Sequence, residues 1–246
     1  MNKSKKILLT WYIELGMDCF FKNSKTQNLQ NKINNINNSN INNKQKIRLI
    51  SQQMADNCDT IEQLQKTVKN FDKLDITRGA TNTVFADGNP KSKIMFIGEA
   101  PGINEDRFGI PFCGKSGKLL DNILRAIKLN RKNCYITNTI FWRPPANRKP
   151  TPNEIEICKP FVKKHIALIN PKIIVLVGGT AVESLLGIKA PMNQLRKQRF
   201  QYIDEYVTKT ISTFIIFHPS YLLRQPSQKK TMWHDIQKIY QCYKML

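Results

Sequence analysis

The stretch KIMFIGEAPG, residues 93–102, indicates the fold class. It begins with an apolar run that ends at Gly98, which is typical of a strand buried on both faces of a sheet. Similar runs follow at residues 134–141 (CYITNTIF), 172–177 (KIIVLV) and 213–217 (TFIIF). Segments with helical periodicity separate these runs. The sequence therefore predicts an α/β fold, a three-layer α/β/α domain around a central, mostly parallel four-stranded sheet.

The segments around the predicted strands carry helix signals. Thr151 and Glu154 have the spacing of a capping box, and Pro152 stands at the first helical position, so a helix should begin there. In the other segments, apolar residues recur at helical spacing. The expected helices span residues 61–71, 116–129, 152–170, 181–186 and 231–243.

Two segments precede the α/β region. Apolar residues recur at helical spacing over residues 7–15, which predicts a short amphipathic helix within residues 1–25. Residues 28–43 contain nine asparagines and have no periodic apolar face. This composition predicts a flexible linker over residues 26–57. The folded domain is then expected over residues 58–246.

The charge balance concerns partners rather than fold. The chain has 39 Lys and Arg against 18 Asp and Glu, a net charge of +21. Residues 61–246 hold 30 and 14 of these, or +16, so the surplus lies mainly in the predicted domain. A basic domain suits a polyphosphate such as nucleic acid. A generally lysine-rich, solvated surface is the alternative.

Several classes are excluded by what the sequence lacks. No run of about 18 uncharged apolar residues is present, so a membrane span is not expected. The apolar stretch at residues 7–21 contains Glu14 and Asp18 and is a poor signal peptide. The six cysteines include no CxxC pair, which argues against a zinc ribbon and a disulfide framework. We expect a cytoplasmic protein.

Polar residues follow the predicted strands where parallel strands end. Glu99 follows the first strand, the second strand runs through Asn138, and His218 follows the fourth. Each has a common structural alternative: a turn carboxylate, an Asn that caps its own turn, or a hydrogen-bonding His. Because the carboxyl ends of parallel strands share one edge, their coincidence predicts a cleft there. Gly178 and Gly179 follow the third strand without a phosphate-loop pattern, which favours a close-packing turn.

Three motifs carry a family resemblance. The segments GEAPGINEDRFGIPFCGKSGKLL (98–120), YITNTIFWRPPANRKPTPNEIEICKPF (135–161) and HPSYLLRQP (218–226) resemble the type-4 uracil-DNA glycosylases of bacteria and archaea. ATNTVFADGNP (80–90) fits the stretch before the first strand in that family, and the resemblance covers roughly residues 58–240.

The resemblance implies a monofunctional enzyme of base excision repair. Such an enzyme flips uracil out of DNA, hydrolyses its N-glycosidic bond and leaves an abasic site. The implied partner is uracil-containing DNA, and we expect a monomer in the bacterial cytosol. A glycosylase for another deaminated base, or a nucleic-acid-binding module without catalysis, is the alternative.

The resemblance also assigns roles to residues. Glu99 and Glu105 would stabilise the sugar cation and position water, and His218 would support the anionic leaving group. Ala100 stands where glycosylases with a GQDPYH loop have Asp, so either glutamate could be the main water-positioning group. The expected uracil pocket consists of Ala100, Pro101, Gly102, Phe112 and Asn138.

In that pocket Phe112 would stack on the base and Asn138 would read its edge. Leu222 is the expected wedge into the duplex, with Leu223 beside it; packing of both in the core is the alternative. The expected DNA contacts are Arg143, Arg148, Ser220, Leu222, Leu223 and Arg224.

One departure from the family concerns a metal cluster. Most type-4 enzymes hold a 4Fe–4S cluster with four cysteines. At those positions this chain has Phe71, Leu74, Trp142 and Cys158, so only one of the four is a thiol. We expect no cluster and no other cofactor.

Overall fold

Four parallel strands form the centre of the sheet, in the order β3-β2-β4-β6. They match the four predicted strands and confirm the α/β class. Two unpredicted antiparallel strands, β1 and β5, pair with β3 and β6 at the edges. The prediction of four strands is wrong, because each edge strand has three residues and no apolar run. The strands are β1 (Ala86–Gly88), β2 (Ile94–Gly98), β3 (Tyr135–Asn138), β4 (Ile173–Val177), β5 (Phe200–Tyr202) and β6 (Ile211–Ile216).

Two helices begin at threonine caps. The Thr151 hydroxyl accepts from the backbone N–H of Glu154, as predicted, and the Thr60 hydroxyl accepts from the backbone N–H of Gln63 at the start of the helix over residues 61–69. The α-helices are α3 (Ile61–Lys69), α4 (Asp75–Gly79), α5 (Ile103–Phe108), α6 (Lys115–Ala126), α7 (Pro152–Ile169), α8 (Gly179–Leu186), α9 (Met192–Leu195), α10 (Pro219–Arg224) and α11 (Lys229–Lys244). Short 3-10 helices span Pro145–Asn147 and Pro226–Gln228.

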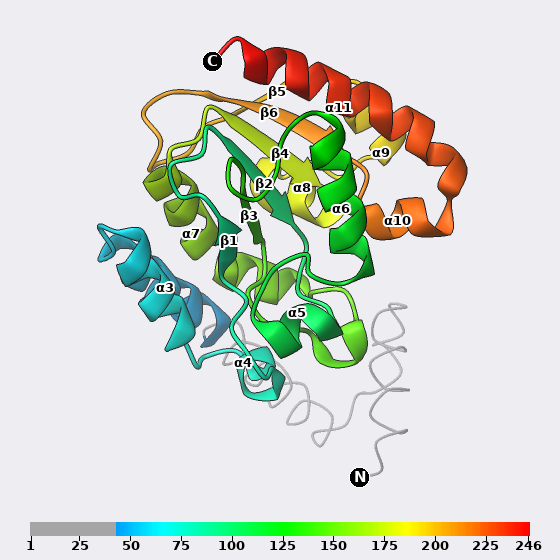
Figure 1. The fold of residues 1–246 in the computed structure, drawn as a ribbon. Helices are drawn as coiled ribbons and strands as arrows, with labels where there is room; N and C mark the ends of the chain where they lie inside the picture. The colour runs from blue at the N-terminus through cyan, green and yellow to red at the C-terminus, as the bar shows by residue number, and fades with distance from the viewer. Residues whose placement is uncertain (1–42) are drawn as a thin grey trace, which may run out of the picture. The chain divides into compact units, whose positions relative to one another are not determined.

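Alternate residues of each central strand enter two different apolar clusters. In β2, Ile94 and Phe96 pack with α6 and α11, whereas Met95 and Ile97 pack with α3, α7 and α8. Figure 1 shows the sheet between these two groups of helices. The period of two along a strand thus produces the predicted α/β/α layers.

The structure, a computed structural model, describes residues 43–246. The predicted amphipathic helix in residues 1–25 and most of the asparagine run lie outside the described residues. Residues 43–56 are helical, so the linker expected to reach residue 57 ends earlier. Ser51 and Ala55 are fully buried and Arg48 pairs with Glu156 on α7, contacts that a solvated linker would not make. None of the described helices has the length and apolarity needed to cross a membrane.

The strand order places a crevice at one edge of the sheet. β2 and β4 are neighbours, but β3 lies beyond β2 and β6 beyond β4, so the chain leaves the two central strands in opposite directions. In open α/β sheets, ligands bind at this switch point, outside the carboxyl ends of the strands.

Candidate active site

A pocket of about 500 Å³ lies at the carboxyl ends of β2 and β3. It brings together most of the predicted site residues, whereas Arg143, Leu222 and Leu223 do not line it. Several lining residues, among them Asn104, Lys115 and Asn147, were not predicted. The predicted residues in its lining are Glu99, Ala100, Pro101, Gly102, Glu105, Phe112, Asn138, Arg148, His218, Ser220 and Arg224.

Asn138 occupies the floor of the pocket at the end of β3, opposite Gly98 of β2. It is 2% exposed, yet within residues 43–246 no hydrogen bond satisfies its side-chain amide. A Cβ atom on Gly98 would lie 2.4 Å from Asn138 Oδ1 and 2.5 Å from Phe112 Cζ. Glycine is therefore required here for both side chains to lie against the end of β2. The Asn138 amide is not among the fully enclosed unpartnered atoms of the described residues, so it opens on the pocket and can bond to a ligand there.

Phe112 is held in a strained backbone conformation. Its φ angle is +52°, in the left-handed region that bulky residues rarely adopt. Arg131 donates to the carbonyl oxygens of Pro111 and Phe112, at 3.0 and 2.5 Å. Arg131 is itself fixed by carboxylates from two elements, Asp87 at 2.6 Å and Asp121 at 2.9 Å. The sequence alone does not indicate this arginine, because its contacts join segments that are distant in the chain.

His218 faces Phe112, with ring centroids 5.6 Å apart. Its Nδ1 accepts from the backbone N–H of Ser220 at 3.2 Å and lies 2.8 Å from the Ser220 hydroxyl. An Nδ1 that accepts a backbone N–H carries no proton, so the neutral ring carries its proton on Nε2. Burial lowers the pKa of His218 below its usual value, although the charges of Glu99 and Glu105 oppose the shift. The side chain is thus a neutral donor.

The two glutamates differ in their contacts. Glu105 Oε2 accepts from the N–H of Gly102 at 3.1 Å, and its Oε1 accepts from the N–H of Gly114 at 2.8 Å. Both of its oxygens therefore close the loop around the pocket. Glu99 accepts one side-chain bond, from the Thr180 hydroxyl to Oε2 at 2.5 Å. Of these two glutamates, only Glu99 has a side-chain oxygen without a hydrogen bond to the described residues, and this oxygen can contact a ligand.

The arginines predicted to contact DNA are not equivalent. Arg148 makes two hydrogen bonds to Glu154, at 2.8 and 2.6 Å. Arg143 donates to Asn147 and lies 4.0 Å from Asp106. Arg224 is exposed, lines the pocket and has no ion pair in the described part of the chain. It is the arginine of this set with an unoccupied guanidinium.

The exposure predicted for Leu222 is wrong. Leu222 is fully buried in the cluster with α6 and α11, whereas Leu223 is 45% exposed. The two residues follow His218 on α10, where neighbours point about 100° apart, so one faces the core and the next faces solvent. The core-packing alternative therefore holds for Leu222 and fails for Leu223.

The residues at the family's cluster positions pack as a core. Phe71, Leu74, Trp142 and Cys158 belong to one buried apolar cluster, and the Phe71 ring stacks on Trp142 with centroids 6.0 Å apart. Burial raises the pKa of the Cys158 thiol. Among residues 43–246, no group of three or more His, Cys, Asp or Glu side chains could hold a metal ion. A donor set of one buried thiol does not fit a cubane cluster.

The fold and the pocket together define an enzyme class. A basic α/β/α domain whose switch-point pocket offers an aromatic face, an unpaired amide, a carboxylate and a neutral imidazole is built to hold a planar base beside a breaking bond. That is the requirement of a DNA glycosylase.

The comparisons with known proteins agree. A family model described as the uracil DNA glycosylase superfamily matches residues 85–237. A type-4 uracil-DNA glycosylase of Sulfurisphaera tokodaii is 37% identical over 184 residues, 74% of this chain and 84% of that protein. Another, from Thermotoga maritima, is 37% identical over 183 residues, 73% of this chain and 93% of that protein. The chain belongs to the uracil-DNA glycosylase superfamily and is similar to its type-4 members.

Proposed function

We propose that this glycosylase removes uracil from DNA by hydrolysis and leaves an abasic site for base excision repair. The observation that carries the proposal is the Asn138 side chain, which lines the pocket at the end of β3 and makes no hydrogen bond with protein groups of residues 43–246, so that its amide faces the space a ligand would occupy. One amide offers a donor and an acceptor, which complement O4 and N3–H of uracil. Cytosine presents the reverse pattern, which the amide could match only after a half-turn about its terminal torsion. In the orientation that fits uracil, cytosine leaves polar groups of the pocket unpaired, at a cost of about 1–3 kcal/mol for each group.

The pocket residues divide the chemical step between the sugar and the base. As the N1–C1′ bond breaks, its electron pair leaves with uracil and positive charge develops on the sugar. The Glu99 carboxylate stabilises that charge and orients a water molecule. Water adds its oxygen to C1′, and the proton it loses balances the released uracil anion. The Nε2–H of His218 donates to uracil O2 and supports the leaving group, while Phe112 stacks on the base.

The residues after His218 provide the contacts with duplex DNA. We assign Leu223, which is exposed, as the wedge that enters the stack vacated by uracil. Arg224 would neutralise a backbone phosphate beside the pocket. Leu222, the wedge predicted from the sequence, is fully buried and cannot enter the duplex.

We propose that the enzyme works without an iron–sulfur cluster. The support is the chemistry of the donor set, in which Phe71, Leu74 and Trp142 fill the volume with apolar packing. Iron analysis of protein purified without oxygen should give far less than four irons per chain. Stoichiometric iron, or absorbance typical of thiolate-bound iron, would refute this proposal.

We also propose that the protein is a monomer in the bacterial cytosol. Light scattering would test the oligomeric state, and cell fractionation would test the location.

The direct test of function is base release from a labelled duplex with a single uracil. Alkali cleavage should reveal the abasic site, and chromatography should identify uracil as the product. Matched duplexes that contain cytosine, thymine or hypoxanthine serve as controls. Release of hypoxanthine alone would assign the enzyme to another deaminated base. Tight binding without release of any base would indicate a binding module.

A further inference from the structure

The turn after β4 leads into a residue that bonds to a pocket glutamate and has no assigned role. Thr180 lies in the first turn of α8 and donates its hydroxyl to Glu99 Oε2 at 2.5 Å. The two residues are 81 positions apart, and the bond joins the turns after β2 and β4, the strands that flank the switch point. We propose that Thr180 is a positioning residue that fixes the orientation of the Glu99 carboxylate; this inference rests on the catalytic role proposed for Glu99.

The backbone that carries Thr180 is held firmly. Gly178 adopts a φ of +96°, and its N–H donates to Ile216 of β6 at 3.0 Å. A side chain at Gly178 would be strained by that φ, and its Cβ would lie 3.2 Å from the Cβ of His218. Ala181 and Val182, which follow Thr180 in α8, are fully buried. The turn thus packs against His218 on one side and bonds to Glu99 on the other.

The Thr180 hydroxyl restricts rotation of the Glu99 carboxylate about its terminal torsion. The terminal torsion of a glutamate is broad, so an unrestrained carboxylate presents its oxygens in many directions. Thr180 is β-branched, which restricts its χ1 to few rotamers, and in the rotamer observed its hydroxyl anchors one Glu99 oxygen. The other oxygen is left to face the sugar and the attacking water. A misplaced catalytic group lowers the reaction rate strongly, because correct orientation of the reacting groups supplies much of an enzyme's rate enhancement.

The test compares Thr180→Val, which keeps the branched shape but loses the donor, with Thr180→Ser, which keeps the donor. We expect Thr180→Val to lower the single-turnover rate of uracil release by about 10-fold or more, and Thr180→Ser to retain most of the rate. Affinity for uracil-containing duplex, measured by fluorescence anisotropy, should change little in both variants. Ser184→Ala is the matched control, because Ser184 lies on the same helix with no partner for its hydroxyl among residues 43–246.

A double-mutant cycle with Glu99→Ala isolates the connection. If Thr180 acts through Glu99, adding Thr180→Val to Glu99→Ala should leave the already low rate unchanged. A wild-type rate for Thr180→Val, equal losses in the Val and Ser variants, or additive losses in the cycle would overturn the positioning role. In each of those results uracil release by the unsubstituted chain would still stand. Absence of uracil release by the unsubstituted chain would overturn the proposed function, and the inference with it.

Discussion

At the scale of single residues, Gly98 permits the base pocket to exist. A methyl group there would overlap Asn138 Oδ1 and the edge of Phe112, both of which come from other segments of the chain. We predict that Gly98→Ala reduces uracil release by about 100-fold or more, because the base-reading amide and the stacking ring must both move. Single-turnover kinetics and a thermal melt would separate loss of the site from loss of the fold. A variant with the wild-type rate would show that the pocket is described wrongly.

His218 provides a pH-dependent prediction. Burial favours the neutral ring, so the pKa of His218 should lie below 6.5, and the neutral form should still predominate when the pH has fallen to 6.5. Imidazole titration by NMR would check this, with His218→Gln used to assign the signal. His165 is also buried and its pKa is lowered to about 3, so its signal should titrate at a much lower pH than that of His218. A His218 pKa above 6.5 would contradict a neutral donor.

Site residues at strand ends could be predicted from the sequence, whereas residues that act through long-range contacts could not. Glu99, Asn138 and His218 could be predicted because each adjoins an apolar strand, and strand ends meet at one edge. Thr180 and Arg131 could not, because their importance lies in contacts with Glu99 and Phe112 that connect distant segments. Nothing in the local sequence around either residue distinguishes it from an ordinary helix or loop position.

At the scale of elements, α10 divides its two leucines between stability and function. Leu222→Ala should lower the free energy of unfolding by about 2–5 kcal/mol, because a fully buried side chain leaves a cavity. Leu223→Ala should leave stability almost unchanged and slow uracil release from duplex more than from single-stranded DNA, which needs no wedge. Urea denaturation and paired substrate assays would measure both. A Leu222 variant that is stable but impaired on duplex would reverse the assignment.

The central strands could be predicted from the sequence, whereas the edge strands and the helix over residues 43–56 could not. The central strands are buried on both faces, so burial alone leaves an apolar run in the sequence. The edge strands β1 and β5 are partly solvated and short, so backbone pairing rather than composition defines them. The helix over residues 43–56 was missed because the asparagine run before it dominates the local composition.

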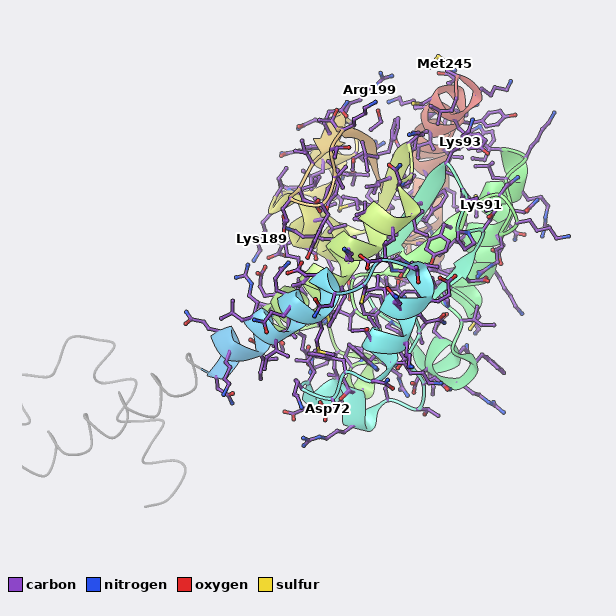
Figure 2. All side chains as sticks on the ribbon, turned by 90° about the vertical axis from the view of Figure 1, so that its left-hand side faces the viewer. Asp72, Lys91, Lys93, Lys189, Arg199 and Met245 are labelled. Atoms are coloured by element: carbon purple, nitrogen blue, oxygen red, sulfur yellow. The ribbon has the colours of Figure 1, made fainter. Side chains whose placement is uncertain are left out.

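At the scale of the whole molecule, the +21 charge should govern DNA affinity through salt. Figure 2 shows Lys91, Lys93, Lys189 and Arg199 at the surface, and none of them lines the pocket, so the basic surplus extends beyond the pocket edge. Individual contributions should nevertheless differ. Arg224→Ala should reduce the slope of log affinity against log salt by about 0.9, the value for one phosphate contact on duplex DNA.

Arg148→Ala is the matched comparison, because its guanidinium is already paired with Glu154. It should change the slope less than Arg224→Ala does. Anisotropy titrations over a range of salt concentrations would give both slopes. Equal changes in the two variants would show that the Arg148 ion pair opens when DNA binds.

The most direct test of the central claim is the base selectivity of Asn138→Asp, measured as single-turnover release of uracil and of cytosine from otherwise identical duplexes. If the Asn138 amide reads the base edge, the wild-type chain should release uracil and leave cytosine intact. The variant should release uracil more slowly and discriminate less against cytosine, while duplex affinity is retained. Unchanged uracil release with unchanged selectivity would contradict the account, because the buried amide would then have no part in recognition.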